Sequence, residues 1–147
     1  MKELFETTPS PLVPPLRSKG ELFDAACVAV GKNPNDFNAE VHFVTSDEIR
    51  ALNKKWRGKD EPTDVLSFPL GDFNPATGKT ELGDIVICRE CAGEFSEEFL
   101  YLHGLLHLMG YTHKEMDAII KEAMQSVVAR NTFGRLSAGS AIQEEIE

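Results

Sequence analysis

The sequence is short of cysteine, of long apolar runs and of positive charge, and each shortage excludes a class of protein. Its three cysteines cannot form the paired framework of a small disulfide-rich secreted protein. No stretch approaches the ~20 consecutive apolar residues that a helix needs to cross a bilayer. Glu3, Glu6 and four prolines interrupt the N-terminal region, so we do not expect a secretory signal peptide. We therefore expect a cytoplasmic protein without a membrane segment.

Positive charge is scarce overall but concentrated in one place. The chain has 15 Lys and Arg against 24 Asp and Glu, and its net charge of −9 excludes broad, nonspecific nucleic-acid binding. Five of the 15 basic residues nevertheless fall within residues 50–59, RALNKKWRGK. We call these five the basic cluster: Arg50, Lys54, Lys55, Arg57 and Lys59. Charge alone favours the solvated end of a helix over a binding site for a polyanion.

The length and the composition fit one domain. The chain has 147 residues, of which 41% are hydrophobic, enough for a real core. We predict a proline-rich arm over residues 1–15, because proline fixes φ and removes a backbone donor. A single domain is expected over residues 16–133. Residues 134–147 are mostly small and acidic, and we predict that they form a disordered tail. We expect the protein to be a monomer.

Apolar periodicity and capping residues predict an α+β fold in which helices cover a small mixed sheet. Helices are expected over residues 18–31, 46–55, 97–109 and 114–130, and strands over residues 39–44, 65–68 and 85–88. Thr45 or Ser46 is the candidate N-cap of the second helix, and Ser96 that of the third. Pro69 is expected to end its strand, and residues 70–81 to form a loop or hairpin.

Three of the four histidines fall within eleven residues, HGLLHLMGYTH. His103 and His107 are four positions apart, so they lie one turn apart on the same face of a helix and can converge on one ion. Gly110 lets the chain leave the helix in a sharp turn, after which His113 can return to the same point. The spacing therefore predicts three nitrogen ligands for a metal ion, which we expect to be one zinc per chain.

This metal site would be of the catalytic kind, because three protein ligands leave a fourth position for water or substrate. The competing interpretation is that the histidines are ordinary buried residues. The segment from Phe99 to Met109 is almost wholly apolar, however, and buried imidazoles need polar partners. The fourth histidine, His42, lies opposite the Val41 and Phe43 side of its predicted strand, and we interpret it as structural or surface-exposed.

The same spacing occurs in the metzincin protease pattern H-E-x-x-H-x-x-G-x-x-H, with one decisive difference. Those proteases place a glutamate, the general base, directly after the first histidine. Here this position is Gly104, which cannot transfer a proton. The sequence thus predicts a metzincin-like three-histidine metal site on a central helix, without peptidase chemistry.

Cys88 and Cys91 form a second and weaker motif, because C-x2-C is a spacing found in metal and redox sites. The pair has no second C-x2-C partner elsewhere in the sequence. We interpret the two cysteines as small residues at the end of a strand, and keep a metal or redox site as the alternative.

The histidine segment and two further stretches resemble the motifs of the YbeY family, bacterial endoribonucleases that act in ribosomal RNA maturation. HGLLHLMGYTH resembles the family signature H-G-x-L-H-L-x-G-Y-D-H. The run RGKDEPTDVLSFP at residues 57–69 resembles the family block R-G-K-D-x-P-T-D-V-L-S-F-P. LGDIVI at residues 82–87 resembles the family strand L-G-D-I-x-I. The resemblance runs over residues 41–116, about half of the chain.

This resemblance implies a zinc-dependent endoribonuclease that hydrolyses RNA phosphodiester bonds in small-subunit ribosomal RNA maturation and ribosome quality control. It implies an α+β fold, a zinc site at His103, His107 and His113, and a catalytic role for Arg57 in the cleft beside the metal. His103 is expected to be catalytic as well as a ligand, and the domain over residues 16–133 to be the catalytic, metal-binding one. The implied partners are precursor ribosomal RNA and ribosomal proteins.

The chain departs from the family pattern in two places. The family aspartate before the third histidine is Thr112 here, so any support that this carboxylate gives to the site must come from elsewhere. The Thr112 hydroxyl is the candidate. The proline-rich arm also lacks the alternating first strand of the family, which leaves the edge of the predicted sheet open.

If the substrate is RNA, the basic cluster becomes a candidate binding site for its phosphates, because Lys and Arg contacts to phosphates supply most of the affinity for RNA. We expect Arg57 to hold the scissile or an adjacent phosphate through its planar fork of donors. Trp56 could stack on an unpaired base, although a lone tryptophan is more often a core residue. Asp64 and Asp84 are interpreted as structural, and no general base is assigned.

Two other functions remain open on the sequence. One is a zinc hydrolase of peptides or small molecules, and Gly104 argues against its peptidase form. The other is a ribosome-assembly factor that binds RNA around a structural metal without cutting it. The open fourth ligand position favours catalysis over this second alternative.

Overall fold

The computed structural model describes residues 19–135. The predicted arm over residues 1–15 and most of the predicted tail lie outside the described residues. The helices are α1 (Lys19–Ala29), α2 (Ser46–Arg57), α3 (Glu97–Leu108) and α4 (His113–Arg135), the strands are β1 (Phe37–Phe43), β2 (Val65–Asn74) and β3 (Lys79–Ile87), and short 3-10 turns are η2 (Pro34–Asp36) and η3 (Arg89–Cys91). Within this part of the chain, no helix combines the length and the apolar character that a bilayer crossing requires.

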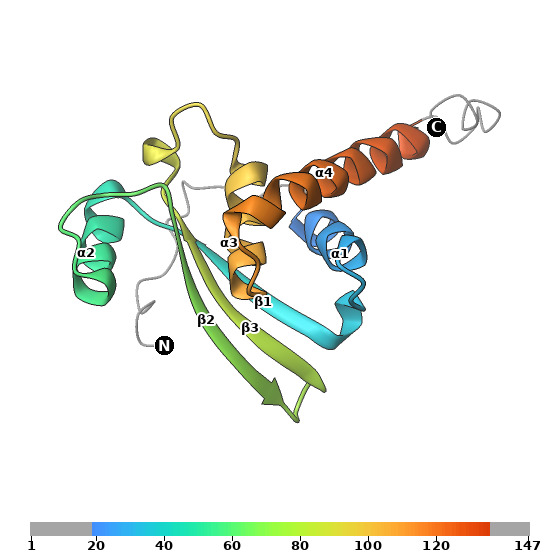
Figure 1. Ribbon diagram of the computed structural model, residues 1–147, viewed down its shortest axis with the longest axis horizontal. Coiled ribbons are helices and arrows are strands. Elements are labelled where there is room, and N and C mark those ends of the chain that lie inside the picture. Colours follow the sequence, from blue (N-terminus) through green and yellow to red (C-terminus); the bar gives the residue numbers. More distant parts are fainter. Residues whose placement is uncertain (1–18, 136–147) are drawn as a thin grey trace.

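The described strands form a mixed sheet in which β3 lies between β1 and β2 (Figure 1). β1 is parallel to β3, and β2 is antiparallel to it. The hairpin between β2 and β3 turns at Asn74, whose side-chain oxygen accepts from the backbone N–H of Ala76 at 2.9 Å. The predicted α+β class and the small mixed sheet are therefore confirmed.

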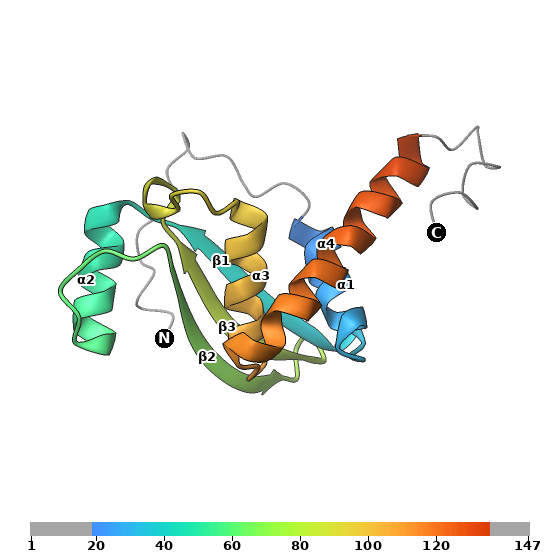
Figure 2. The same ribbon diagram turned by 45° about the horizontal axis from the view of Figure 1, so that its top comes forward.

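Successive side chains of β3 point to opposite faces of the sheet, as in any strand. Ile85 and Ile87 belong to the larger core cluster, which contains residues of α3 and continues into α1 and α4 (Figure 2). Val86 and Cys88 belong to a smaller cluster, which contains Ile49 of α2. One face of the sheet thus carries the buried helix α3, and the other carries α2.

Two of the predicted helix starts are confirmed. The Thr45 hydroxyl accepts from the backbone N–H of Glu48 at 3.1 Å, and the Glu48 carboxylate accepts from the N–H of Thr45 at 2.8 Å, which makes a capping box at α2. At α3, the Ser96 hydroxyl accepts from the backbone N–H of Phe99 at 3.1 Å. These caps fix where the two helices that border the candidate site begin.

Two predicted boundaries are wrong. β2 continues past Pro69 to Asn74, so the strand end predicted at Pro69 is wrong, and residues 70–81 take the hairpin rather than the loop of the two predicted alternatives. Pro69 is tolerated because β2 is an edge strand among the described strands, and the pairing register shifts between Pro69 and Asp72. α4 also runs on to Arg135, so the first two residues of the predicted tail are helical.

Candidate metal centre

α3 carries two of the three predicted ligands and lies unusually close to the sheet. At Gly104, an added Cβ would stand 2.6 Å from Cγ2 of Ile85 and 3.2 Å from Oγ of Ser67. The Ser67 hydroxyl of β2 donates to the Gly104 carbonyl at 3.0 Å. This close approach holds His103 and His107, both partly buried, at a fixed distance from β2.

The same packing explains the missing metzincin glutamate. The position after the first histidine faces the sheet, where even a methyl group would overlap Ile85. A glutamate side chain therefore has no room at residue 104 in this arrangement of α3 and β3. The absence of that general base is a consequence of how the helix packs.

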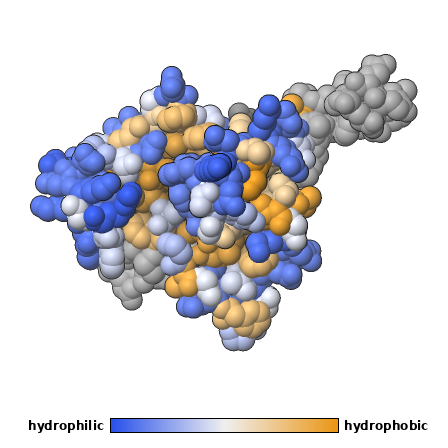
Figure 3. Space-filling model, viewed as in Figure 1, coloured by the Kyte–Doolittle hydropathy of each residue, from blue (hydrophilic) through white to orange (hydrophobic). Residues whose placement is uncertain are grey.

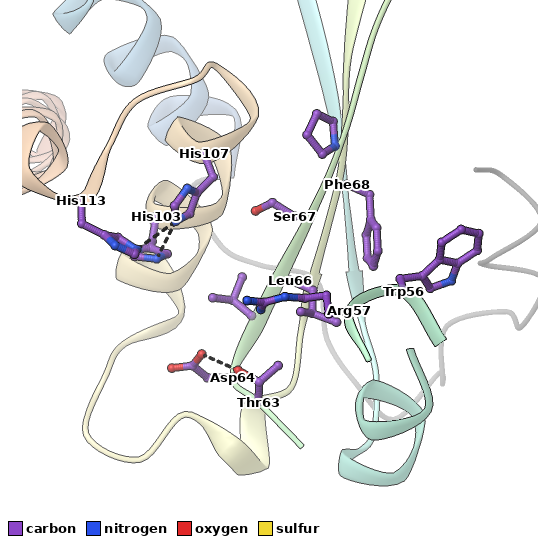
Figure 4. A pocket seen from close by; sticks show the side chains of 12 residues that line it. Trp56, Arg57, Thr63, Asp64, Leu66, Ser67, Phe68, His103, His107 and His113 are labelled. Atoms are coloured by element: carbon purple, nitrogen blue, oxygen red, sulfur yellow. Dashed lines mark hydrogen bonds between the residues drawn. The ribbon is translucent and has the colours of Figure 1, made fainter. Parts of the chain in front are cut away.

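The three predicted ligands converge on one point. Nε2 of His107 lies 3.2 Å from Nε2 of His103 and 3.0 Å from Nε2 of His113 (Figure 4). Two ligand nitrogens at ~2.0–2.1 Å from a tetrahedral ion lie about 3.3–3.4 Å apart, so the observed spacing fits one small ion. The three imidazoles thus form a group that could hold a metal ion.

His113 reaches this point through a sharp turn and a helix start. Gly110 adopts a φ of 94°, a conformation that favours glycine, and α4 begins at His113. The Thr112 hydroxyl and backbone N–H both donate to the Glu115 carboxylate, at 3.0 and 2.9 Å, and these bonds lower the pKa of Glu115. The hydroxyl that stands where the resemblance places an aspartate is therefore bonded within the first turn of the helix that begins at His113.

The electrostatics of the site favour neutral imidazoles at His103 and His107. Burial lowers the pKa of His103, and the neighbouring His113 lowers it further, against the opposing charge of Asp64. Burial also lowers the pKa of His107, followed by the effects of His103, His113 and Arg57. Because an imidazole must be neutral to bind a metal, these shifts favour the form of His103 and His107 that can bind one near neutral pH.

A cleft runs from the histidines along β2 to the end of α2. Its volume is about 610 Å³, and its lining includes Trp56 and Arg57 of α2 as well as β2 residues from Val65 to Pro69. Figure 4 shows the Arg57 side chain extending between Trp56 and the three histidines. The structure therefore brings Arg57 into the same cleft as the three predicted ligands.

The basic cluster does not act as one surface. Arg50 Nε donates to Oδ1 of Asp60 at 2.8 Å, and Lys54 Nζ lies 3.9 Å from Oδ2 of the same carboxylate. Asp60 thus offsets part of the charge on the outer side of α2, whereas Arg57 lines the cleft. Hydrophilic side chains gather over α2, and apolar surface lies beside them toward the middle of the molecule (Figure 3).

His42 lies apart from the other histidines, on a strand of the sheet. Its Nε2 atom is 3.1 Å from Oδ1 of Asp84 and 3.8 Å from Oε1 of Glu40. These three residues form a second group with metal-ligating atoms, which the sequence did not predict because Asp84 comes from a different strand. The bond to His42 provides the 8% exposed Asp84 with a polar partner, which fits the structural interpretation of both residues.

Asp64 lies closer to the candidate centre than the sequence predicted. It lines the cleft, and its Oδ1 accepts from the Thr63 hydroxyl at 3.5 Å. Its negative charge acts on the pKa of His103. The signal that could have identified it was its place in the run RGKDEPTDVLSFP, which also contains Arg57.

Cys88 and Cys91 lie where β3 meets η3, with their sulfur atoms 2.9 Å apart. Burial raises the pKa of the Cys88 thiol, which disfavours the thiolate that metals bind. Within residues 19–128, whose side chains are described, the pair does not belong to a group of three potential metal ligands.

Comparison with known protein families identifies the chain. The model of the YbeY family, described as Endoribonuclease YbeY, matches residues 21–131. The chain belongs to the YbeY family. The match includes the three histidines, Arg57 and the whole cleft between them, so the predicted family resemblance is confirmed.

Relatives described as Endoribonuclease YbeY occur in several bacteria. The protein of Thermoanaerobacter sp. (strain X514) is 41% identical over 124 residues, which cover 69% of this chain and 78% of that protein. For the protein of Staphylococcus epidermidis the identity is 44% over 114 residues, with coverages of 60% and 74%. For that of Chromohalobacter salexigens it is 34% over 126 residues, with coverages of 75% and 81%. The solution structure of TM1509 from Thermotoga maritima is 32% identical, covers 82% of each chain and has a TM-score of 0.47.

Proposed function

We propose that this protein is a zinc-dependent endoribonuclease that hydrolyses phosphodiester bonds in ribosomal RNA. The observation that carries the proposal is the convergence of the three histidines, with Nε2 of His107 3.2 and 3.0 Å from those of His103 and His113, in one cleft with Arg57 in a YbeY-family chain. Three imidazoles hold an ion and leave a position for water or substrate, which is the arrangement of catalytic zinc sites.

The residues of the cleft have different roles: the histidines hold the metal, and Arg57 binds the phosphate. Zinc held by the histidines would supply positive charge at the phosphate and lower the pKa of a water toward ~7. Arg57 binds the phosphate through two parallel N–H donors and orients it toward the histidines. His103 would contribute by helping to hold this ion. The carboxylate of Asp64 lies in the same cleft.

The alternative of a zinc peptidase is disfavoured by packing. A metzincin-like peptidase needs a carboxylate directly after the first histidine, and residue 104 has no room for a side chain. The alternative of a structural metal is disfavoured by the cleft, because its cavity of about 610 Å³ reaches the histidines and leaves them accessible. Phosphodiester hydrolysis fits both observations.

The names of the relatives support a proposal for the biological setting. Relatives in three bacterial genera are described as Endoribonuclease YbeY. We infer that this chain acts as a monomer in the cytoplasm on precursor small-subunit ribosomal RNA, next to ribosomal proteins. We assign the catalytic and metal-binding functions to residues 16–133.

Cleavage assays with two substrate classes test the proposal. Zinc-loaded protein is incubated with a ribosomal RNA fragment and, in parallel, with casein and a panel of peptides. The proposal predicts RNA cleavage and no peptide turnover. His107→Ala, purified in the same way, controls for contaminating nuclease and should cleave neither substrate. Peptide turnover that His107→Ala abolishes, without RNA cleavage, would show that the protein is a peptidase.

A further inference from the structure

Trp56 occupies an unusual position for the sole tryptophan of the chain. It follows the buried α2 residues Ile49 and Asn53 at helical spacing, which would place it in the core. Its side chain is nevertheless 47% exposed, because it lies at the end of α2, where it lines the cleft. A large aromatic side chain is thus presented to a cavity that also contains the candidate metal ligands.

The cleft has an apolar end and a polar end. Trp56 and Phe68 lie at one side of it, and the three histidines lie at the other (Figure 4). Arg57 lies between the two parts (Figure 4). A nucleotide has the same division, because a flat apolar base is joined to a charged phosphate. If the phosphate binds at Arg57, the base attached to it or to the next nucleotide lies at the apolar end.

We propose that Trp56 stacks on an unpaired base of the substrate and thereby sets which phosphodiester bond reaches the histidines. The inference rests on the proposed function and adds a specificity-determining residue to it. Stacking on an aromatic ring is the usual way in which proteins bind single-stranded RNA bases, and it tolerates every base because each has a π-face.

Lys55 supports this assignment. Its ammonium nitrogen lies 5.2 Å from the centroid of the Trp56 ring, at a distance typical of a cation–π contact. A base on the indole brings its own phosphate into this region, where the flexible lysine can pair with it. The protein as a whole carries a charge of −9, so such a local cation directs RNA to this end of the cleft.

Because Trp56 is the one tryptophan of the sequence, intrinsic fluorescence reports on it directly. The catalytically silent variant His107→Ala is titrated with a short single-stranded RNA, so that cleavage does not interfere. The expected result is quenching of the emission on binding. A ribose-phosphate oligomer of the same length without bases should bind more weakly and leave the emission unchanged.

Placing one abasic nucleotide at each position in turn locates the stacked base. We expect quenching to disappear at one position, at a fixed distance from the bond that the active protein cleaves. A decrease spread evenly over all positions, or quenching by the base-free oligomer, would overturn the proposal, because the indole would then sense charge or a conformational change.

Substitutions separate stacking from folding. Trp56→Leu should raise KM for RNA roughly tenfold, within the range measured for single aromatic–base stacks, and shift or scatter the cleavage positions. Trp56→Phe should restore most of the affinity, because the ring can still stack. Phe73→Leu is the matched control, since Phe73 is 64% exposed but lies outside the cleft lining.

The result for Trp56 is separable from the result for the proposed function. RNA cleavage that Trp56→Leu leaves unchanged in KM and in position would contradict the stacking role and preserve the endoribonuclease. Loss of zinc or of the folded state in Trp56→Leu would also contradict it, because the tryptophan would then be structural.

Discussion

The two walls of the cleft are built in opposite ways. α3 is buried along most of its length and packs on the sheet so tightly that Gly104 admits no side chain. The end of α2 projects from a much smaller core cluster and presents Trp56 and Arg57 to the cavity. The rigid α3 wall carries two of the three candidate metal ligands, His113 follows at the start of α4, and the exposed wall carries the candidate substrate-binding residues. Substitutions in the first wall should therefore change the zinc content and the free energy of unfolding, and substitutions in the second should change only the binding and cleavage of RNA.

The largest effect is expected at the metal ligands. His103→Ala, His107→Ala and His113→Ala should each lower the zinc content from about one per chain and abolish RNA cleavage, because each removes one of three nitrogen ligands. Elemental analysis of the purified variants measures this directly.

His42→Ala is the matched control for these three variants. His42 bonds to Asp84 and lies apart from the three-histidine group, so its removal should leave the zinc content unchanged. Full zinc content in His107→Ala, or loss of zinc in His42→Ala, would mean that the metal binds elsewhere. Among the described residues, the other group of potential ligands is Glu40, His42 and Asp84.

The next largest effect is expected at Arg57, on the exposed wall. Arg57→Ala should lower kcat by ~100-fold, the scale expected for removing one charge-stabilising donor, while zinc content stays at the wild-type value. Arg57→Lys should recover little, because an ammonium group cannot donate two parallel hydrogen bonds to the phosphate. Single-turnover and steady-state kinetics separate kcat from KM.

The Lys54→Ala/Lys55→Ala variant is the comparison for Arg57. Both lysines lie on α2 outside the cleft lining, so their removal should raise KM and leave kcat unchanged. A plot of the logarithm of the RNA-binding constant against the logarithm of the salt concentration should become shallower, by about one unit of slope for each phosphate contact that is lost. If Arg57→Ala behaves in the same way as the lysine variant, Arg57 only binds RNA and has no role in the chemical step.

On the rigid wall, Gly104→Ala should destabilise the fold by about 1–3 kcal/mol, because its methyl group would meet Ile85 and force α3 away from the sheet. Denaturant unfolding of the metal-free protein measures this free energy. Gly20→Ala serves as the control, since a Cβ there meets nothing within 4 Å. Equal stabilities of the two variants would show that α3 does not pack as closely as described.

The smallest effect is a pH dependence of the metal-free protein. Burial lowers the folded-state pKa of His103 and His107 below the ordinary value of 6.5, so the folded chain binds fewer protons than the unfolded chain. The stability from these two residues is therefore present above pH 6.5 and is lost as the pH falls through their folded-state pKa values. Thermal unfolding of chelator-treated protein, followed from about pH 7.5 down to about pH 5, should show this decrease.

The double variant His103→Gln/His107→Gln tests whether the histidines cause that dependence. Its neutral amides do not titrate, so its unfolding temperature should vary less with pH over the same range. An unchanged pH profile would assign the effect to other groups.

The sequence could predict the rigid wall more fully than the exposed one. Spacing alone brought His103, His107 and His113 together, because i, i+4 geometry and a glycine turn are local properties of the chain. The reason for Gly104 was not local, since it depends on Ile85 of a distant strand. The sequence therefore shows that the glutamate is absent, but the reason for its absence is visible only in the packing of α3 against the sheet.

The exposed wall depends on tertiary packing that periodicity does not reveal. The spacing of Ile49, Asn53 and Trp56 indicates one buried face, yet α2 extends beyond its core cluster and Trp56 faces the cleft. The continuation of β2 past Pro69 was missed for a related reason, because proline stops only a strand that is paired on both sides. In both cases the residue lies at the end of a helix or in an edge strand, where the sequence rule that applies to buried helices and central strands does not hold.

Zinc titration of the metal-stripped protein decides whether the three-histidine group is the catalytic centre. The protein is treated with a chelator, and RNA cleavage is followed as zinc is added in known ratios to the chain. We expect no cleavage without metal, an increase that saturates at about one zinc per chain, and no recovery in His107→Ala at any ratio. Full cleavage by the metal-free protein, or equal recovery in His107→Ala, would contradict a catalytic zinc at this site.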